Sequence, residues 1–155
     1  MTFRTAGLEV HSVDRGDLAS GQSPPAERAG PTRVLVVGTD DWAIEQTVPM
    51  LERQGCEVLR CHAPGEPDFP CNALIPGRTC PLDAGFEVVV TVRARALTTL
   101  APGEFGVVCA LHNDIPLVVA GVGADQPLDR WTTRLVAQGG DVASAAKAAA
   151  GRTTS

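Results

Sequence analysis

The stretch VLVVGTDDWAIEQTVPMLERQGCEV, residues 34–58, predicts a strand, a helix and a second strand in succession, and it decides the fold. It opens within the apolar run RVLVVG (33–38), which is typical of a strand buried on both faces of a parallel sheet. Asp40 or Asp41 can cap the helix that follows, and Gly55 can end it. Pro49 predicts a kink or a later start of that helix.

The rest of the chain continues the alternation of strands and helices. Helices are expected at 102–112 and from the Asp141 cap to Gly151, where the chain is rich in alanine. Strands after the first are expected in CEVLRC (56–61), FEVVVTV (86–92), PLVVAG (116–121) and WTTRLVAQ (131–138). Strands alternating with helices predict an α/β fold with a doubly wound, mostly parallel five-stranded sheet.

The two ends of the chain differ in composition from its middle. Residues 1–32 are rich in Gly, Pro, Ser and charge, which predicts a flexible tail, with GLEVHSV (7–13) as a short strand. We expect one domain at 33–150 and a short C-terminal tail at 151–155.

Charge and hydropathy exclude several classes of function. The formal net charge is −5 and the basic residues are scattered, whereas nucleic-acid binding needs clustered Lys or Arg. No apolar run approaches the ~18 residues of a membrane span, and the first residues lack the apolar core of a signal peptide. We therefore expect a cytoplasmic protein that binds neither nucleic acid nor membrane.

From Arg33 to about Ala150, the order of elements resembles the receiver domain of bacterial response regulators, which has a flavodoxin-like fold. Residues 34–58 are similar to the family's first strand, helix and second strand, and FGVVCALHNDIPLVVAG (105–121) is similar to its third helix and fourth strand. The resemblance implies a regulatory module that binds a protein partner or a second copy of itself. The family's docking face would then include Leu135, Val142 and Ala146.

The same resemblance locates the residues that would carry phosphorylation. In that family, acidic side chains hold Mg²⁺ and an aspartate accepts the phosphoryl group. The matched positions hold none of the family's residues: the acidic pair falls on Gly38 and Thr39, the acceptor on Val92 or Thr91, the hydroxyl residue on Gly121 and the lysine on Ala137. We therefore expect a non-enzymatic module without catalytic residues that is not phosphorylated on aspartate.

The stretch CHAPGEPDFPCNALIPGRTCPLDAG, residues 61–85, stands where the family has its second helix. Its five prolines exclude a regular helix and predict a long Cys- and Pro-rich loop instead. The loop starts at a strand end, so it is expected at the carboxyl edge of the sheet, where open α/β folds bind ligands.

The cysteines of this loop allow three interpretations. Cys61, His62, Cys71 and Cys80 offer thiolate and imidazole ligands for a zinc ion or an iron–sulfur cluster. A thiol redox sensor is the second interpretation, with a reversible disulfide between Cys71 and Cys80 and Arg78 lowering a thiol pKa. In the third, the cysteines only fill space against the sheet, as is expected of Cys56 and Cys109 in the core.

A further alternative is a small-ligand site at the carboxyl edge. Its residues would be Thr39, Asp40, Asp41 and Thr91, which follow or end the first and third predicted strands. The glycine patterns of nucleotide-binding loops are absent there, so the class of ligand stays open.

Overall fold

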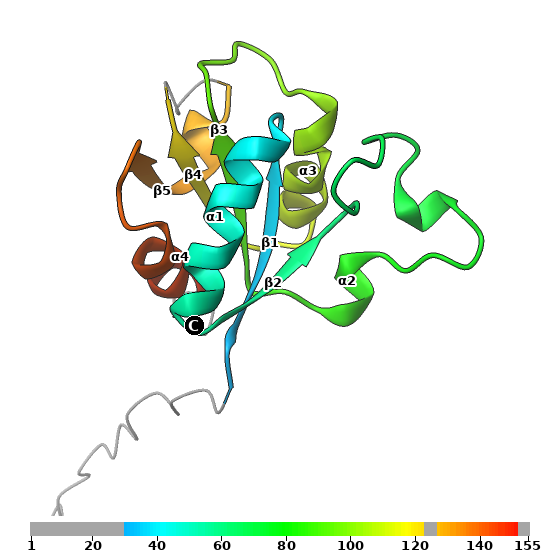
Figure 1. Cartoon of the computed structure of the whole chain (residues 1–155), viewed down its shortest axis with the longest axis horizontal. Coiled ribbons are helices and arrows are strands. Elements are labelled where there is room, and N and C mark those ends of the chain that lie inside the picture. Colours follow the sequence, from blue (N-terminus) through cyan, green and yellow to red (C-terminus); the bar gives the residue numbers. More distant parts are fainter. Residues whose placement is uncertain (1–29, 123–126, 152–155) are drawn as a thin grey trace, which may run out of the picture.

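The computed structural model describes residues 30–122 and 127–151, and a five-stranded sheet forms its centre (Figure 1). The strand order is β2-β1-β3-β4-β5, and every neighbouring pair of strands is parallel. This is the order of flavodoxin-like folds, so the predicted α/β class is confirmed. The strands are β1 (Thr32–Gly38), β2 (Cys56–Arg60), β3 (Val88–Arg93), β4 (Leu117–Gly121) and β5 (Thr132–Ala137).

Helix α1 (Asp41–Arg53) begins and ends where its boundary residues predict. The carboxylate of Asp40 caps it by accepting hydrogen bonds from the first turn, at 2.9 Å from the backbone nitrogen of Trp42. Just beyond the helix, Gly55 adopts a φ of +81°, a left-handed conformation that ends a helix at little steric cost for glycine. Pro49 lies inside the helix, so the predicted later start is wrong.

Helices cover both faces of the sheet, because successive residues of a buried strand point to opposite faces and both sides need apolar partners (Figure 1). Helices α1 and α4 (Val142–Ala150) close one apolar core. Helix α3 (Phe105–His112) closes the second core together with the chain between β2 and β3. Asp141 caps α4, as predicted, and its carboxylate accepts a hydrogen bond from the backbone nitrogen of Ser144 at 2.9 Å.

The connection from β2 to β3 is not entirely a loop. It contains a 3₁₀ turn, η1 (Asn72–Leu74), and a four-residue helix, α2 (Pro81–Ala84). Pro81 takes the first position of α2, where the missing N–H group of a proline is not needed. The expected Cys- and Pro-rich loop is therefore interrupted by two short helical elements.

The predicted ends of the domain can be compared only in part. β1 begins at Thr32 and α4 ends at Ala150, close to the expected limits of 33 and 150. The predicted strand at 7–13, most of the predicted N-terminal tail and residues 152–155 lie outside the described residues.

Candidate functional site: a thiol pocket beside a closed carboxyl edge

The small-ligand prediction concerns four residues at the carboxyl edge of the sheet: Thr39, Asp40, Asp41 and Thr91. Asp40 is the cap of α1, and Asp41 forms an ion pair with Arg60 at 3.6 Å. Thr91 is fully buried, and its hydroxyl donates a hydrogen bond of 2.8 Å to Oε1 of Glu104. Three of the four side chains thus serve helix capping, ion pairing and a buried network. These structural roles already engage the polar groups of Asp40, Asp41 and Thr91.

A buried ion pair between Arg93 and Glu104 occupies the carboxyl edge at the middle strand of the sheet. Both side chains are fully buried, and Nε of Arg93 lies 2.7 Å from Oε1 of Glu104. The guanidinium also donates to Oε2 at 3.2 Å, and the backbone nitrogen of Ala101 does so at 3.3 Å. With the hydroxyl of Thr91 on Oε1, the carboxylate has the set of partners that a buried charge requires.

The turn that carries Glu104 also closes the end of β1. Turn η2 (Pro102–Glu104) approaches this strand so closely that a Cβ atom on Gly103 would collide with the carbonyl oxygen of Gly38. A Cβ atom on Gly38 would lie only 2.6 Å from the carbonyl oxygen of Val92. Gly38 and Val92 are the positions matched to the acidic pair and the phosphoacceptor of receivers. Main-chain atoms therefore crowd the place where that chemistry needs carboxylates.

Neither Arg93 nor Glu104 is among the site residues predicted from the sequence. One feature of the sequence could have indicated the pair: Arg93 directly follows the apolar run VVVTV (88–92), so it is expected to be buried. A buried arginine requires an acidic partner. Nothing in the spacing points to Glu104 as that partner, since the residues between them form an irregular connection.

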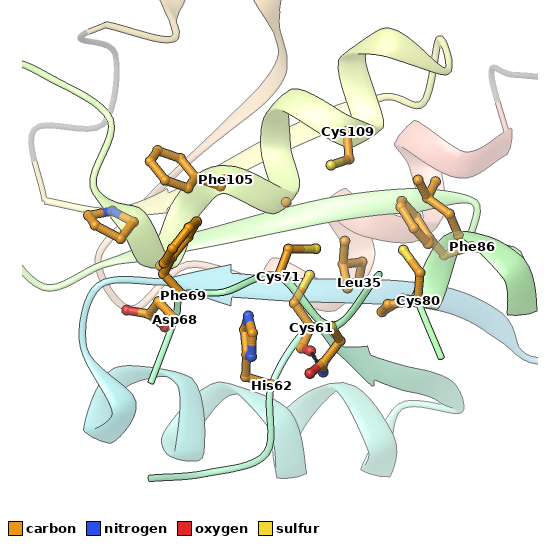
Figure 2. A pocket seen from close by; sticks show the side chains of 16 residues that line it. Leu35, Cys61, His62, Asp68, Phe69, Cys71, Cys80, Phe86, Phe105 and Cys109 are labelled. Carbon is orange, nitrogen blue, oxygen red and sulfur yellow. Dashed lines mark hydrogen bonds between the residues drawn. The ribbon is translucent and has the colours of Figure 1, made fainter. Parts of the chain in front are cut away.

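A mostly apolar pocket of about 150 Å³ lies between α3 and the connection from β2 to β3 (Figure 2). Buried Leu35 and Phe86 contribute to its wall. Phe69 and Phe105 also line it, and they are 69% and 48% exposed. Four cysteines line this cavity, which we call the thiol pocket: Cys61, Cys71, Cys80 and Cys109.

The four thiols reach the pocket from separate elements. Cys61 directly follows β2, while Cys71 and Cys80 immediately precede η1 and α2. Cys109 lies on α3, and the prediction that it is a core residue is wrong because its helix face borders the cavity. Cys56 is buried in the core on the opposite face of the sheet, as predicted.

Gly106 on α3 leaves space for Sγ of Cys61, because glycine has no side chain. A Cβ atom at Gly106 would lie 3.1 Å from Sγ of Cys61 and 2.7 Å from Cγ1 of Val37. The helix can therefore lie close to both β1 and the end of β2 only with glycine at this position.

The thiols of the pocket influence each other's ionisation. Burial raises the pKa of Cys61 to about 12, and the neighbouring thiols of Cys71, Cys80 and Cys109 add to the rise. Burial also raises the pKa of Cys109, followed by the effects of Cys71 and Cys80. Cys61 and Cys109 are therefore protonated at neutral pH, and they are weak nucleophiles. All five cysteines are free, so the predicted Cys71–Cys80 disulfide is not formed in this structure.

Hydrogen bonds hold the chain around the pocket in place. Nη1 of Arg78 lies 2.9 Å from both carboxylate oxygens of Glu66 and 3.2 Å from Oδ1 of Asn72. The side-chain amide of Asn72 donates to the backbone oxygen of Cys61. Hydrogen bonding to Arg78 also lowers the pKa of Glu66. Arg78 is thus paired with the carboxylate of Glu66.

The predicted metal ligands Cys61, His62, Cys71 and Cys80 all line the thiol pocket. Within residues 30–122 and 127–151, however, no group of three or more His, Cys, Asp or Glu residues is arranged to hold a metal ion. The four side chains surround an apolar cavity instead of converging on one point (Figure 2). This geometry does not provide the tetrahedral ligand set that zinc requires.

The predicted docking face is only partly exposed. Leu135 on β5 is 58% exposed, whereas Val142 and Ala146 are buried in the core beneath α4. The prediction that Val142 and Ala146 contact a partner is therefore wrong. Helix α4 begins after the Asp141 cap, and both residues lie on the face of the helix that packs on the sheet. Phe69 and Phe105 are instead exposed apolar side chains at the thiol pocket.

Comparisons of this chain with protein-family models, with curated proteins and with solved structures found no match. Among the described parts of the chain, no helix has the length and apolar character required to cross a membrane.

Proposed function

We propose that this chain is a non-enzymatic, receiver-like regulatory module that binds another protein and is not phosphorylated on aspartate. The observation that carries the proposal is the contrast between a filled carboxyl edge and an open apolar pocket bordered by exposed Phe69 and Phe105. The strand order supports the likeness to receivers, since β2-β1-β3-β4-β5 is the order of flavodoxin-like folds.

The state of the carboxyl edge supports the absence of phosphorylation. The phosphoacceptor falls on Val92 or Thr91, and both are buried. Glu104, the acidic side chain at this position, is paired with Arg93 and fully enclosed. A phosphodonor would have to displace this ion pair before it could reach the carboxylate of Glu104.

The thiol pocket supports a partner that presents an apolar side chain. A cavity of this size accommodates one aromatic ring, and its walls are mostly carbon and sulfur. Exposed aromatic residues beside a concave apolar surface are typical of the centres of protein interfaces. We therefore infer that a partner inserts one apolar residue between Phe69 and Phe105.

Site-specific photo-crosslinking tests this interaction. A benzophenone amino acid at position 69 should give a discrete cross-linked species in the native cells, and one at exposed position 46 on α1 should not. A cross-link formed by the purified protein alone at twice the mass of the chain would identify a second copy as the partner. Equal or absent cross-linking at both positions would contradict the proposal.

A phosphodonor assay tests the second part of the proposal. Purified protein incubated with acetyl phosphate and Mg²⁺ should carry no acid-stable, base-labile acyl phosphate, while an authentic receiver treated in parallel should be modified. Incorporation of one phosphoryl group on Asp40, Asp41 or Glu104 would overturn it.

A further inference from the structure

Four of the five cysteines of this chain meet at one apolar pocket, although three come from the connection between β2 and β3 and the fourth from α3. The chain around two of them is directly linked. The side-chain amide of Asn72, the residue after Cys71, donates a hydrogen bond to the backbone oxygen of Cys61. This bond anchors the backbone of η1 against the end of β2, and both cysteines line the pocket beside it (Figure 2).

The mutual influence of the thiols agrees with this placement. Among the neighbouring thiols that raise the pKa of Cys61, Cys71 has the largest effect, ahead of Cys80 and Cys109. Cys71 also precedes Cys80 in its effect on Cys109. Among the neighbouring thiols, Cys71 therefore has the largest effect on the pKa of both half-buried cysteines, Cys61 and Cys109.

We propose that Cys61 and Cys71 form an oxidative modification site, at which a low-molecular-weight disulfide converts the two thiols into a reversible protein disulfide. This pairing differs from the Cys71–Cys80 pair that sequence spacing favoured. The hydrogen bond between Asn72 and Cys61 is the reason for the difference, since it brings together two segments that the spacing leaves independent.

The reaction proceeds by two thiol–disulfide exchanges. The thiolate of Cys71 attacks one sulfur of the small disulfide, which forms a mixed disulfide and releases the first small thiol. Cys61 then loses its proton and attacks the sulfur of Cys71, which releases the second small thiol. The protein gives up two electrons and two protons, and the small disulfide becomes two thiols. Cys61 takes the second step because burial raises its pKa and makes it a poor first attacker.

The disulfide would have a local structural effect. Phe69 lies between Cys61 and Cys71 in the sequence. A disulfide would therefore link the two ends of the segment that carries the Phe69 ring at the pocket. Oxidation should therefore change the access of a partner to the thiol pocket. This consequence rests on the proposed function, whereas the disulfide itself does not.

Peptide mapping after oxidation separates the possible pairings. Trypsin cleaves after Arg60, Arg78 and Arg93, so Cys61 and Cys71 share the peptide 61–78, while Cys80 lies in the peptide 79–93. We would equilibrate the full reduced chain with glutathione buffers of increasing oxidised fraction, block free thiols with N-ethylmaleimide and digest the protein. The expected product is peptide 61–78 without the label and lighter by two hydrogen atoms than its reduced form.

Variants provide the matched controls. Cys61→Ser and Cys71→Ser should each abolish the internal disulfide, while Cys80→Ser and Cys56→Ala should leave its yield unchanged. Circular dichroism would verify that each variant folds. If a variant does not fold, the peptide map of the oxidised wild-type chain still identifies which cysteines are paired. In urea, the wild-type chain should give a mixture of pairings, because the Asn72 contact is lost.

Three results would overturn the proposal. One is five labelled thiols in the most oxidised buffer, and another is a link between peptides 61–78 and 79–93 as the main product. The third is an internal disulfide that forms equally well in native protein and in urea. A confirmed disulfide without any cross-linked partner at position 69 would support this inference and refute the proposed function.

Discussion

The carboxyl edge around Arg93 and the thiol pocket differ in the kind of polar groups they contain and in whether those groups are already paired. At the edge, a guanidinium, a carboxylate and a hydroxyl are fully buried, and they are joined by short hydrogen bonds. In the pocket, weakly polar thiols line an apolar cavity that has exposed rings beside it. The first region has no free capacity for a ligand, because its charges already stabilise one another. The second region has both space and access, and it is therefore where an external molecule can act.

The largest expected effect is on the buried ion pair. Glu104→Gln should lower the free energy of unfolding by about 3–5 kcal/mol, because Arg93 would keep a buried charge without its counter-ion. Urea denaturation followed by circular dichroism measures this loss. The matched control is Glu66→Gln, which breaks the more exposed pair with Arg78 and should have a much smaller effect.

Two results would refine or contradict this account. A double variant with methionine at positions 93 and 104 should recover much of the lost stability, because it removes both charges together. A loss below ~1 kcal/mol for Glu104→Gln would show that the edge is not held by this ion pair.

A smaller loss is expected at the helix that borders the pocket. Gly106→Ala would place a methyl group 2.7 Å from Cγ1 of Val37 and 3.1 Å from Sγ of Cys61. The resulting overpacking should cost about 1–3 kcal/mol in urea denaturation. Gly151→Ala is the control, because no atom lies within 4 Å of its Cβ position. Equal stability of both variants would show that α3 can move away from the sheet without penalty.

The ionisation of Cys61 predicts a dependence of stability on pH. Its pKa lies near 12 in the folded chain, above its ordinary value of 9.0. Between these values the folded state keeps the proton and the unfolded state loses it, so the free energy of unfolding should fall as the pH rises from about 9 to about 12. Urea denaturation under reducing conditions should show a weaker fall for Cys61→Ala. Identical pH profiles would mean that water reaches this thiol freely.

The smallest effect on stability is expected at the rim of the pocket. Phe69→Ser should change the free energy of unfolding by less than ~0.5 kcal/mol, because the ring is 69% exposed. In the proposed function the same substitution removes a contact with the partner. Cross-linking from a benzophenone amino acid at position 105 should therefore decrease in this variant. A large loss of stability would make Phe69 part of the fold instead of part of an interface.

The regular elements could be predicted because their information is local. The apolar run 33–38, the cap at Asp40 and the stop at Gly55 define β1 and α1 almost to the residue. Asp141 likewise fixes the start of α4. Helix propensity, capping and burial act over a few residues, so one sequence suffices to recognise them.

The candidate sites were predicted less well because they depend on contacts between distant segments. Thr91 and the two aspartates have the residue types of a ligand site, yet their polar groups serve the fold. Cys109 has the pattern of a core residue, yet it faces the pocket. A spacing pattern does not reveal which of these uses a side chain will have.

The sequence by itself determined the strands, the principal helices, the parallel arrangement of the sheet and the absence of receiver phosphorylation residues. Only the tertiary structure decided that Glu104 meets Arg93, that η2 closes the end of β1, and that four thiols share one pocket. The physical reason is that the first group follows from interactions within single elements and from the alternation of those elements. The contact between Glu104 and Arg93, the closure by η2 and the shared thiol pocket depend on the path of irregular connections. That path is determined by packing between distant segments and by the need to pair buried charges.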